Sequence, residues 1–150
     1  MRTDVKRRGW AISAEGNDLA DRFLESVFFT GNGRMGARGY PAYRPIRRPL
    51  DAGLFLAGFY DRISDSTELT DFVNLPTPIW YQIRLNGRIP AIPSHLSRAL
   101  DLRTGLLTFR YRLSIADDWV DVQEQRFFSL AKPSFLFQRL EFQGRGQERK

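Results

Sequence analysis

The last third of the chain alternates apolar and polar residues over three long stretches. This alternation constrains the fold more than any other feature of the sequence. In the first stretch, 106–115, the residues on one side are Leu107, Phe109, Tyr111 and Leu113. The same period continues through 120–128 and 135–142, after a turn at 116–118 and a break at Lys132-Pro133. Successive strand residues point to opposite faces, so the pattern predicts three antiparallel strands in a meander with one buried and one wet face.

The earlier part of the chain predicts shorter and less regular elements. Asn17 or Asp18 could cap a short helix over residues 18–26. The apolar run Gly53–Tyr60 is typical of a buried strand, and the polar stretch 61–71 of a surface loop. Ile79–Leu85 alternates with period two and is followed at once by Asn86-Gly87, which together indicate a β-hairpin. We therefore predict an all-β fold, an antiparallel β-sandwich with a short N-terminal helical turn. Long strands and an irregular first half favour a sandwich over a barrel.

Composition excludes several classes of protein. The 150 residues suggest one domain, and the chain has no Cys, which excludes disulfides, thiolate metal sites and a Cys nucleophile. It contains no run of about 18 apolar residues for a membrane span and no secretory signal pattern, so we expect a cytoplasmic protein with no membrane partner. The net charge of +6 comes mainly from scattered Arg residues that alternate with apolar ones. That pattern favours the wet face of a sheet over a nucleic-acid surface.

Candidate chemistry is sparse. The single His, His95, stands beside Pro93 and Ser94, and we expect it in a solvated loop rather than in a catalytic or metal site. Glu124 shares a strand side with Val120 and Val122, so it needs a partner if that side is the inner one; Arg126 or Arg110 could supply it. The segment 31–36 formally matches a G-x-G-x-x-G nucleotide motif, but prolines follow where a helix should begin, so the context argues against dinucleotide binding. We predict no catalytic residue and no metal ligand.

Seven short motifs, in this order over residues 10–140, resemble the N-terminal β-sandwich domain of glycoside hydrolase family 65, which contains maltose, trehalose and kojibiose phosphorylases and some hydrolases. They are Glu25-Ser26-Val27-Phe28 leading into Gly31-Asn32-Gly33, Gly36-Ala37-Arg38-Gly39, Gly53-Leu54-Phe55-Leu56-Ala57-Gly58-Phe59-Tyr60-Asp61, Val73-Asn74-Leu75-Pro76, Ile83-Arg84-Leu85-Asn86-Gly87, Leu100-Asp101-Leu102-Arg103-Thr104-Gly105-Leu106-Leu107 and Gln125-Arg126-Phe127-Phe128-Ser129.

The resemblance implies that residues 1–143 are part of a supersandwich-type domain and that 144–150 are a polar tail or truncation point. In this family an (α/α)₆ barrel follows the sandwich and holds the catalytic Glu and the phosphate site, so the chain itself is expected not to be catalytic. The implied partners are that barrel, in the same or a separate chain, and a carbohydrate. Inorganic phosphate would be a co-substrate of a parent phosphorylase, and no cofactor is implied.

The same resemblance suggests candidates for the interface with the barrel or the substrate entrance: Asn32, Arg38 and Asn74. The competing interpretation is that Asn32 takes a left-handed turn conformation and Arg38 pairs locally.

An incomplete sandwich would leave edges and apolar faces open, so self-association, including a homodimer, is expected. The alternative function is a stand-alone carbohydrate-binding module. It would require an exposed aromatic row, for which Trp80, Trp119, Tyr81 and Tyr111 are the candidates.

Overall fold

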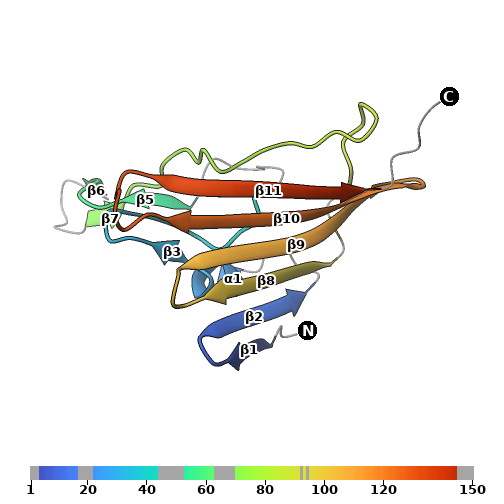
Figure 1. The fold of residues 1–150 in the computed structure, drawn as a ribbon. Coiled ribbons are helices and arrows are strands. Elements are labelled where there is room, and N and C mark those ends of the chain that lie inside the picture. Colours follow the sequence, from blue (N-terminus) through green and yellow to red (C-terminus); the bar gives the residue numbers. More distant parts are fainter. Residues whose placement is uncertain are drawn as a thin grey trace.

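The computed structural model describes residues 4–16, 22–43, 53–62, 70–91, 93 and 95–144. Its main element is a six-stranded antiparallel sheet with the strand order β1-β2-β8-β9-β10-β11 (Figure 1). The strands are β1 Val5–Arg8, β2 Ala11–Gly16, β8 Leu96–Asp101, β9 Leu106–Ile115, β10 Asp118–Phe128 and β11 Leu136–Gly144. The predicted three-strand meander is confirmed as β9, β10 and β11.

Shorter elements accompany this sheet. They are the helix α1 Arg22–Val27, a three-stranded sheet of β3 Thr30–Gly31, β4 Met35–Ala37 and β5 Leu54–Leu56, and a two-stranded sheet of β6 Tyr60–Arg62 and β7 Thr70–Phe72. Figure 1 shows both small sheets gathered at one end of the large sheet, the end that holds the β10–β11 turn. The fold is therefore the predicted all-β sandwich. Of the residues described, no helix is long and apolar enough to cross a bilayer.

The core lies on one face of the large sheet, as the alternation predicts. Leu107, Phe109, Tyr111 and Leu113 of β9 are buried there together with Val120 and Val122 of β10. Helix α1 adds Leu24, and the turn after it adds Phe28. The residues between them on β9, including Arg110 and Arg112, point to the opposite, solvated face. The Arg residues of this strand thus lie on the solvated face, because successive side chains of a strand point to opposite faces of the sheet.

The predicted single buried strand over 53–60 is wrong. The run 53–60 is interrupted by a turn at Ala57-Gly58, where Gly58 has φ of 84°, so it forms β5 and the start of β6 instead of one buried strand. Of this run's side chains, Leu54 is buried while Phe59 and Tyr60 are exposed. The predicted loop 61–71 begins and ends within the β6–β7 pair, and residues 63–69 of it lie outside the described part of the chain.

The predicted strand over 79–85 is also wrong, because this extended stretch does not pair as a strand. Its side chains do alternate, with Ile79 buried and Trp80 exposed. The single bridge Leu85–Arg88 closes the Asn86-Gly87 turn, and both turn residues have positive φ, 49° and 77°. The hairpin turn is confirmed, but nearby prolines, including Pro78 and Pro90, supply no N–H donors for a ladder.

The remaining differences lie in the N-terminal half and at β8. The short helix is present as Arg22–Val27, while residues 18–21 of the predicted range and the candidate caps Asn17 and Asp18 lie outside the described part. Strands β1, β2 and β8 were not predicted. In β8 the inward position between Leu96 and Leu100 is occupied by Arg98, which is completely buried. A charged residue at an inward position hides the alternation that would otherwise reveal the strand.

Candidate functional site

The glycine-rich loop is a β-hairpin that Asn32 organises. Its side-chain Oδ1 accepts hydrogen bonds from the backbone N–H groups of Arg34 and Met35, at 3.1 and 3.0 Å. Its Nδ2 donates to the carbonyl oxygens of Ser129 and Pro133, at 2.7 and 3.0 Å, in the β10–β11 turn. Gly33, not Asn32, takes the positive φ of 84°. All hydrogen-bonding groups of the Asn32 amide are thus used in joining the β3–β4 turn to the β10–β11 turn.

Arg38 and Asn74 meet at Gly53. The backbone N–H of Arg38 donates to the Gly53 carbonyl at 2.9 Å, and the Gly53 N–H donates to Oδ1 of Asn74 at 2.7 Å. Gly53 has φ of 61°, and a Cβ there would lie 2.9 Å from Cδ of Arg38, so the Arg38 side chain passes directly over this glycine. The Arg38 side chain is half-buried, and its guanidinium has no hydrogen bond to any residue in the described ranges. Three chain segments therefore converge at Gly53.

A fully buried ion pair on β10 holds the Arg38 segment against the large sheet. Nη1 of Arg126 lies 3.6 Å from Oε1 of Glu124, and both side chains have no exposed surface. Nη2 of Arg126 donates to the Arg38 carbonyl at 2.7 Å, and the backbone N–H of Ala42 donates to Oε2 of Glu124 at 2.8 Å. One member of the pair thus binds each end of the segment 38–42. The predicted partnership of Glu124 with Arg126 is confirmed; Arg110 instead faces solvent and donates to Gln123.

Burial shifts the pKa of both charged groups, Glu124 and Arg126. Loss of solvation raises the pKa of Glu124, while Arg126, the Ala42 N–H and the Gln138 amide act in the opposite direction. Burial lowers the pKa of Arg126, and the Glu124 carboxylate opposes that shift. The rings of Tyr40 and Phe109 lie 5.3 and 5.1 Å from the guanidinium carbon and supply a weaker attraction to the cation. The pair therefore stabilises the fold only while both partners are present, because removing one of them leaves an uncompensated buried charge.

Tyrosines form a second polar group inside the sandwich. The hydroxyls of Tyr81 and Tyr111 are hydrogen-bonded to each other, and that of Tyr43 donates to the Pro90 carbonyl at 2.9 Å. Burial raises the pKa of all three phenols above the ordinary value of 10, so they stay protonated to higher pH than exposed phenols do. Tyr81 and Tyr111 consequently belong to the core, Trp80 is exposed on a separate segment, and Trp119 on β10 is covered by the Arg112 guanidinium at 4.2 Å. The four aromatics proposed for a carbohydrate-binding row do not form one exposed surface.

The outer face of the large sheet holds a shallow polar groove. Its lining includes His95, Ser97, Arg110, Arg112, Gln123 and Glu141. His95 is exposed at the start of β8, as predicted. Within the described ranges no three metal-binding side chains gather anywhere in the molecule.

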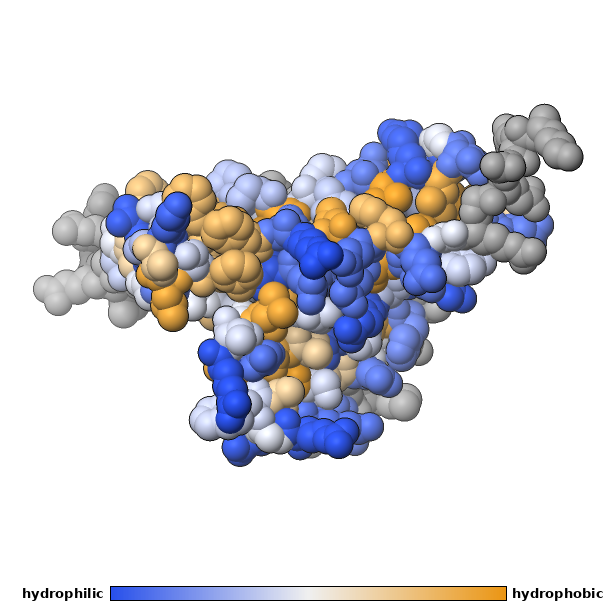
Figure 2. Space-filling model, viewed as in Figure 1, coloured by the Kyte–Doolittle hydropathy of each residue, from blue (hydrophilic) through white to orange (hydrophobic). Residues whose placement is uncertain are grey.

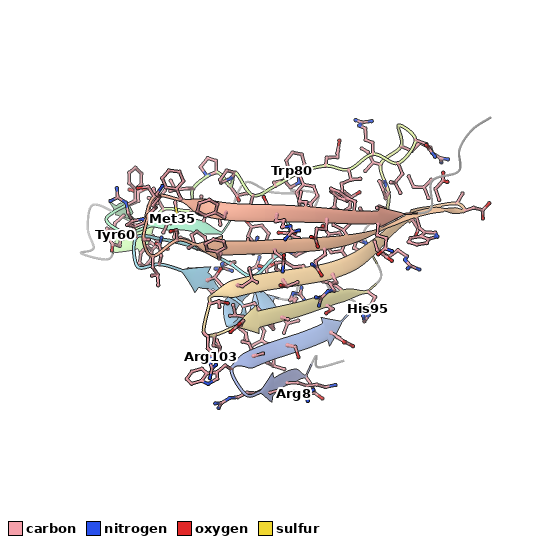
Figure 3. All side chains as sticks on the ribbon, viewed as in Figure 1. Arg8, Met35, Tyr60, Trp80, His95 and Arg103 are labelled. Carbon is pink, nitrogen blue, oxygen red and sulfur yellow. The ribbon has the colours of Figure 1, made fainter. Side chains whose placement is uncertain are left out.

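Exposed aromatic side chains gather at the end of the molecule that carries the glycine-rich hairpin. This set, called the aromatic end below, comprises the exposed Phe29, Tyr60, Phe72, Phe127, Phe135 and Phe137 together with the half-buried Phe55. Phe127 and Phe137 stack with ring centroids 5.1 Å apart, and Phe135 lies 6.1 Å from Phe137. Phe55 contacts both Phe29 and Phe72, and Phe72 contacts Tyr60 at 5.0 Å. Figure 2 shows apolar surface at this end, and Figure 3 places Met35 and Tyr60 there.

Comparison with known proteins identifies the chain. The model of the N-terminal domain of glycosyl hydrolase family 65 matches residues 14–149. The chain belongs to this family. It is similar to trehalose 6-phosphate phosphorylase of Lactococcus lactis subsp. lactis (strain IL1403), with 26% identity over 123 residues. That match covers 75% of this chain and 16% of the relative.

The family 65 domain also resembles a solved structure, a human-microbiome protein assigned as a kojibiose phosphorylase. The TM-score is 0.76 at 15% identity, over 93% of this chain and 20% of the other. At this identity the likeness concerns the fold. The chain thus spans a sixth to a fifth of the length of these two proteins.

The family 65 motifs now have a structural meaning. Asn32 and the pair Arg38–Asn74 lie at opposite ends of β4, and the buried Glu124–Arg126 pair lies beneath the Arg38 segment. The sequence indicated the first three residues only through family likeness. It missed the aromatic end, whose members come from distant segments and follow no shared period. It also missed the role of Ala42, because a backbone N–H leaves no signal in the sequence.

Proposed function

We propose that this chain is a non-catalytic part of the N-terminal domain of a family 65 disaccharide phosphorylase or hydrolase. In this proposal residues 1–143 form the sandwich part. The aromatic end packs against a catalytic (α/α)₆ barrel, carried in the same chain or a separate one, and shapes the entrance to its active site. The parent reaction is phosphorolysis or hydrolysis of an α-glucoside such as maltose, trehalose, trehalose 6-phosphate or kojibiose, with inorganic phosphate as co-substrate in the first case.

The observation that carries this proposal is the exposed aromatic end. Phe135 is 52% exposed, Phe137 45% and Leu130 in the adjoining turn 82%. Large contiguous apolar surface on a soluble domain marks an interaction site, and aromatic residues are enriched in the centres of such sites. This surface adjoins the hairpin that Asn32 fixes, so the partner would also meet the family motif 31–39.

The three candidate residues have different roles in this proposal. Asn32 uses its amide internally and so shapes the hairpin instead of binding a ligand. Asn74 positions Gly53 beneath Arg38. Arg38 has guanidinium donors that make no hydrogen bond to the described residues, and such donors suit carbonyl, carboxylate, phosphate or sugar hydroxyl acceptors of the partner or substrate.

The first test is calorimetric titration of the isolated chain with maltose, trehalose, kojibiose, trehalose 6-phosphate and inorganic phosphate. No heat of binding is expected, because the proposed substrate site lies in the barrel. Saturable binding of any of these sugars would contradict the proposal and favour a carbohydrate-binding module.

The second test reads the genomic sequence around this chain and expresses the chain together with the family 65 barrel encoded there. Arg38→Ala should lower kcat/KM about tenfold or more, the loss expected for a charged hydrogen bond, without lowering Tm. Arg110→Ala, on the outer face of the large sheet, is the matched control and should leave kcat/KM unchanged. Equal kinetics in the two variants would refute the role of Arg38. A frame without a barrel would refute the parent enzyme in the same chain.

A further inference from the structure

Two rows of polar side chains, crossing the strands, line the groove on the outer face of the large sheet. In the register of β8, β9, β10 and β11, the first row is Ser97, Arg110, Gln123 and Glu141. The second row, two residues further along the strands, is Arg112, Asp121 and Gln143. Residues paired across strands lie side by side on one face, so the alternation of β9 and β10 that builds the core also builds this groove.

Hydrogen bonds between neighbouring strands hold these side chains in place. Nε of Arg110 donates to Oε1 of Gln123 at 2.8 Å, and Nε2 of Gln123 donates to Oε2 of Glu141 at 2.8 Å. In the second row, Nε and Nη2 of Arg112 donate to the two carboxylate oxygens of Asp121 at 2.6 and 2.7 Å. Side chains that are already fixed lose little conformational freedom when a ligand binds.

The groove keeps hydrogen-bonding groups that the protein itself does not use. Within the described ranges, the side chains of His95, Ser97 and Gln143 make no hydrogen bond, and Figure 3 places His95 beside the start of β8. The carboxylates of Asp121 and Glu141 have further lone pairs beyond those used in the two rows. The groove therefore offers both donors and acceptors to a ligand.

The charges of the groove lining cancel. The lining contains two arginines, Arg110 and Arg112, and two carboxylates, Asp121 and Glu141. A charged ligand would meet attraction and repulsion together here, whereas a neutral ligand rich in hydroxyl groups uses the donors and the acceptors alike. Phe142, which is 53% exposed and also in the lining, adds an apolar contact for the C–H face of a sugar ring.

The size of the groove favours a chain of sugars over a single small ligand. The first row crosses four strands that lie about 4.8 Å apart, so it is about 14 Å long. The groove has a volume of about 1200 Å³, which exceeds the roughly 300–1,000 Å³ of a typical small-molecule site. A disaccharide is shorter than the row and would leave its last hydrogen-bonding groups in water.

We propose that this groove binds a linear, neutral oligosaccharide of four or more sugar units, laid across β8 to β11. The site is distinct from the aromatic end, which begins at Phe127 on β10. The oligosaccharide is a ligand of the sandwich and not the substrate of the proposed parent reaction, so the inference does not depend on a barrel.

Calorimetric titration of this chain with maltoheptaose and with cellohexaose tests the site. At least one of them should bind with a Kd below about 1 mM. Gln123→Ala should weaken binding about tenfold, because it removes the amide that joins Arg110 to Glu141 and leaves both side chains unfixed. Gln125→Ala is the matched control, because Gln125 lies on the same face of β10 but outside the groove lining, and Kd should not change.

A second variant separates binding from folding. Gln143→Ala removes an exposed amide at the end of the second row without breaking a described side-chain hydrogen bond, so it should weaken binding with no change in Tm. Failure of both oligosaccharides to bind would overturn the proposal. So would equal Kd values for Gln123→Ala and Gln125→Ala, an unchanged Kd in Gln143→Ala, or tighter binding of the anionic chain polygalacturonate.

These results are read separately from the tests of the proposed function. Those tests use disaccharides and phosphate, which do not span the first row. Arg110→Ala therefore remains a suitable control for the kinetics of disaccharide substrates, although it should weaken binding of the longer oligosaccharide.

Discussion

Glu124→Ala offers the sharpest test of how the sandwich holds the Arg38 segment. The carboxylate is completely buried and has three neighbours: Nη1 of Arg126 at 3.6 Å, the Ala42 N–H at 2.8 Å and the Gln138 amide at 3.3 Å. Removing it leaves the Ala42 N–H without its acceptor and Arg126 without its counter-charge. Arg126 cannot respond by losing its proton, because a guanidinium remains protonated in proteins.

The expected magnitude follows from these contacts. A buried N–H left unsatisfied costs about 1–3 kcal/mol, and breaking a buried ion pair by removing one partner costs about 3–5 kcal/mol in total. We therefore expect the free energy of unfolding to fall by about 3–5 kcal/mol, a large part of the roughly 5–15 kcal/mol that a domain has. By contrast, Glu124→Leu/Arg126→Met removes both charges and fills the space, so its cost should be clearly smaller.

Urea unfolding followed by circular dichroism measures these differences. Glu141→Ala is the matched control, because its carboxylate lies on the solvated face and pairs with Arg139 there. An exposed pair of this kind contributes about 0–1 kcal/mol. The reasoning would be refuted if Glu124→Ala cost no more than Glu141→Ala. It would also be refuted if the apolar double variant were less stable than Glu124→Ala.

Three further predictions concern the core, the hairpin and a close contact. The free energy of unfolding should fall as pH rises above about 10, because the unfolded chain then ionises phenols that the folded chain keeps protonated. Absorbance from these phenolates should appear together with unfolding. The phenols whose pKa is raised are Tyr40, Tyr43, Tyr81 and Tyr111. The measurement uses Tyr60→Phe, because Tyr60 is 53% exposed and is not one of these buried phenols. Early phenolate absorbance from this variant while it is still folded would contradict the expectation. Asn32→Ala should lower the free energy of unfolding by about 1–3 kcal/mol. Asn32→Asp keeps the two acceptor contacts but sets a carboxylate oxygen against the carbonyl oxygens of Ser129 and Pro133, so it should lower Tm at least as much as Asn32→Ala. Gly39→Ala should lower Tm more than Gly33→Ala. A Cβ at Gly39 would lie 2.3 Å from Cβ and 2.6 Å from the carbonyl oxygen of Phe28. A Cβ at Gly33 meets nothing within 4 Å and costs only the strain of a left-handed backbone, about 1–2 kcal/mol. Equal Tm values for the two glycine variants would disprove the steric argument.

The sequence by itself determined the large sheet's C-terminal half. Period two fixes which side of β9 and β10 faces the core, since one residue's displacement would turn every side chain to the other face. The same pattern placed Glu124 and Arg126 on one side of their strand, and a buried carboxylate needs a counter-charge, so the sequence predicted a partner for Glu124 but left Arg126 and Arg110 as alternatives. The Asn86-Gly87 turn could likewise be predicted from the local sequence, because few residues other than Asn and Gly accept two successive positive φ values.

Only the tertiary structure decided where the remaining parts meet. Whether 79–85 becomes a strand depends on a neighbouring strand that pairs with it along its length. The described residues give it only separate hydrogen bonds, such as Tyr81 N–H to the Ala42 carbonyl, the Gln138 amide to the Ile79 carbonyl, and the Leu85–Arg88 bridge. The meeting of Asn32 with Ser129 and Pro133, and of Arg126 with the Arg38 carbonyl, joins residues about ninety or more positions apart. Such contacts follow from the packing of layers and leave no period in the sequence. The glycine-rich loop was therefore recognisable from the sequence, but its role in joining the β3–β4 hairpin to the β10–β11 turn came from the fold.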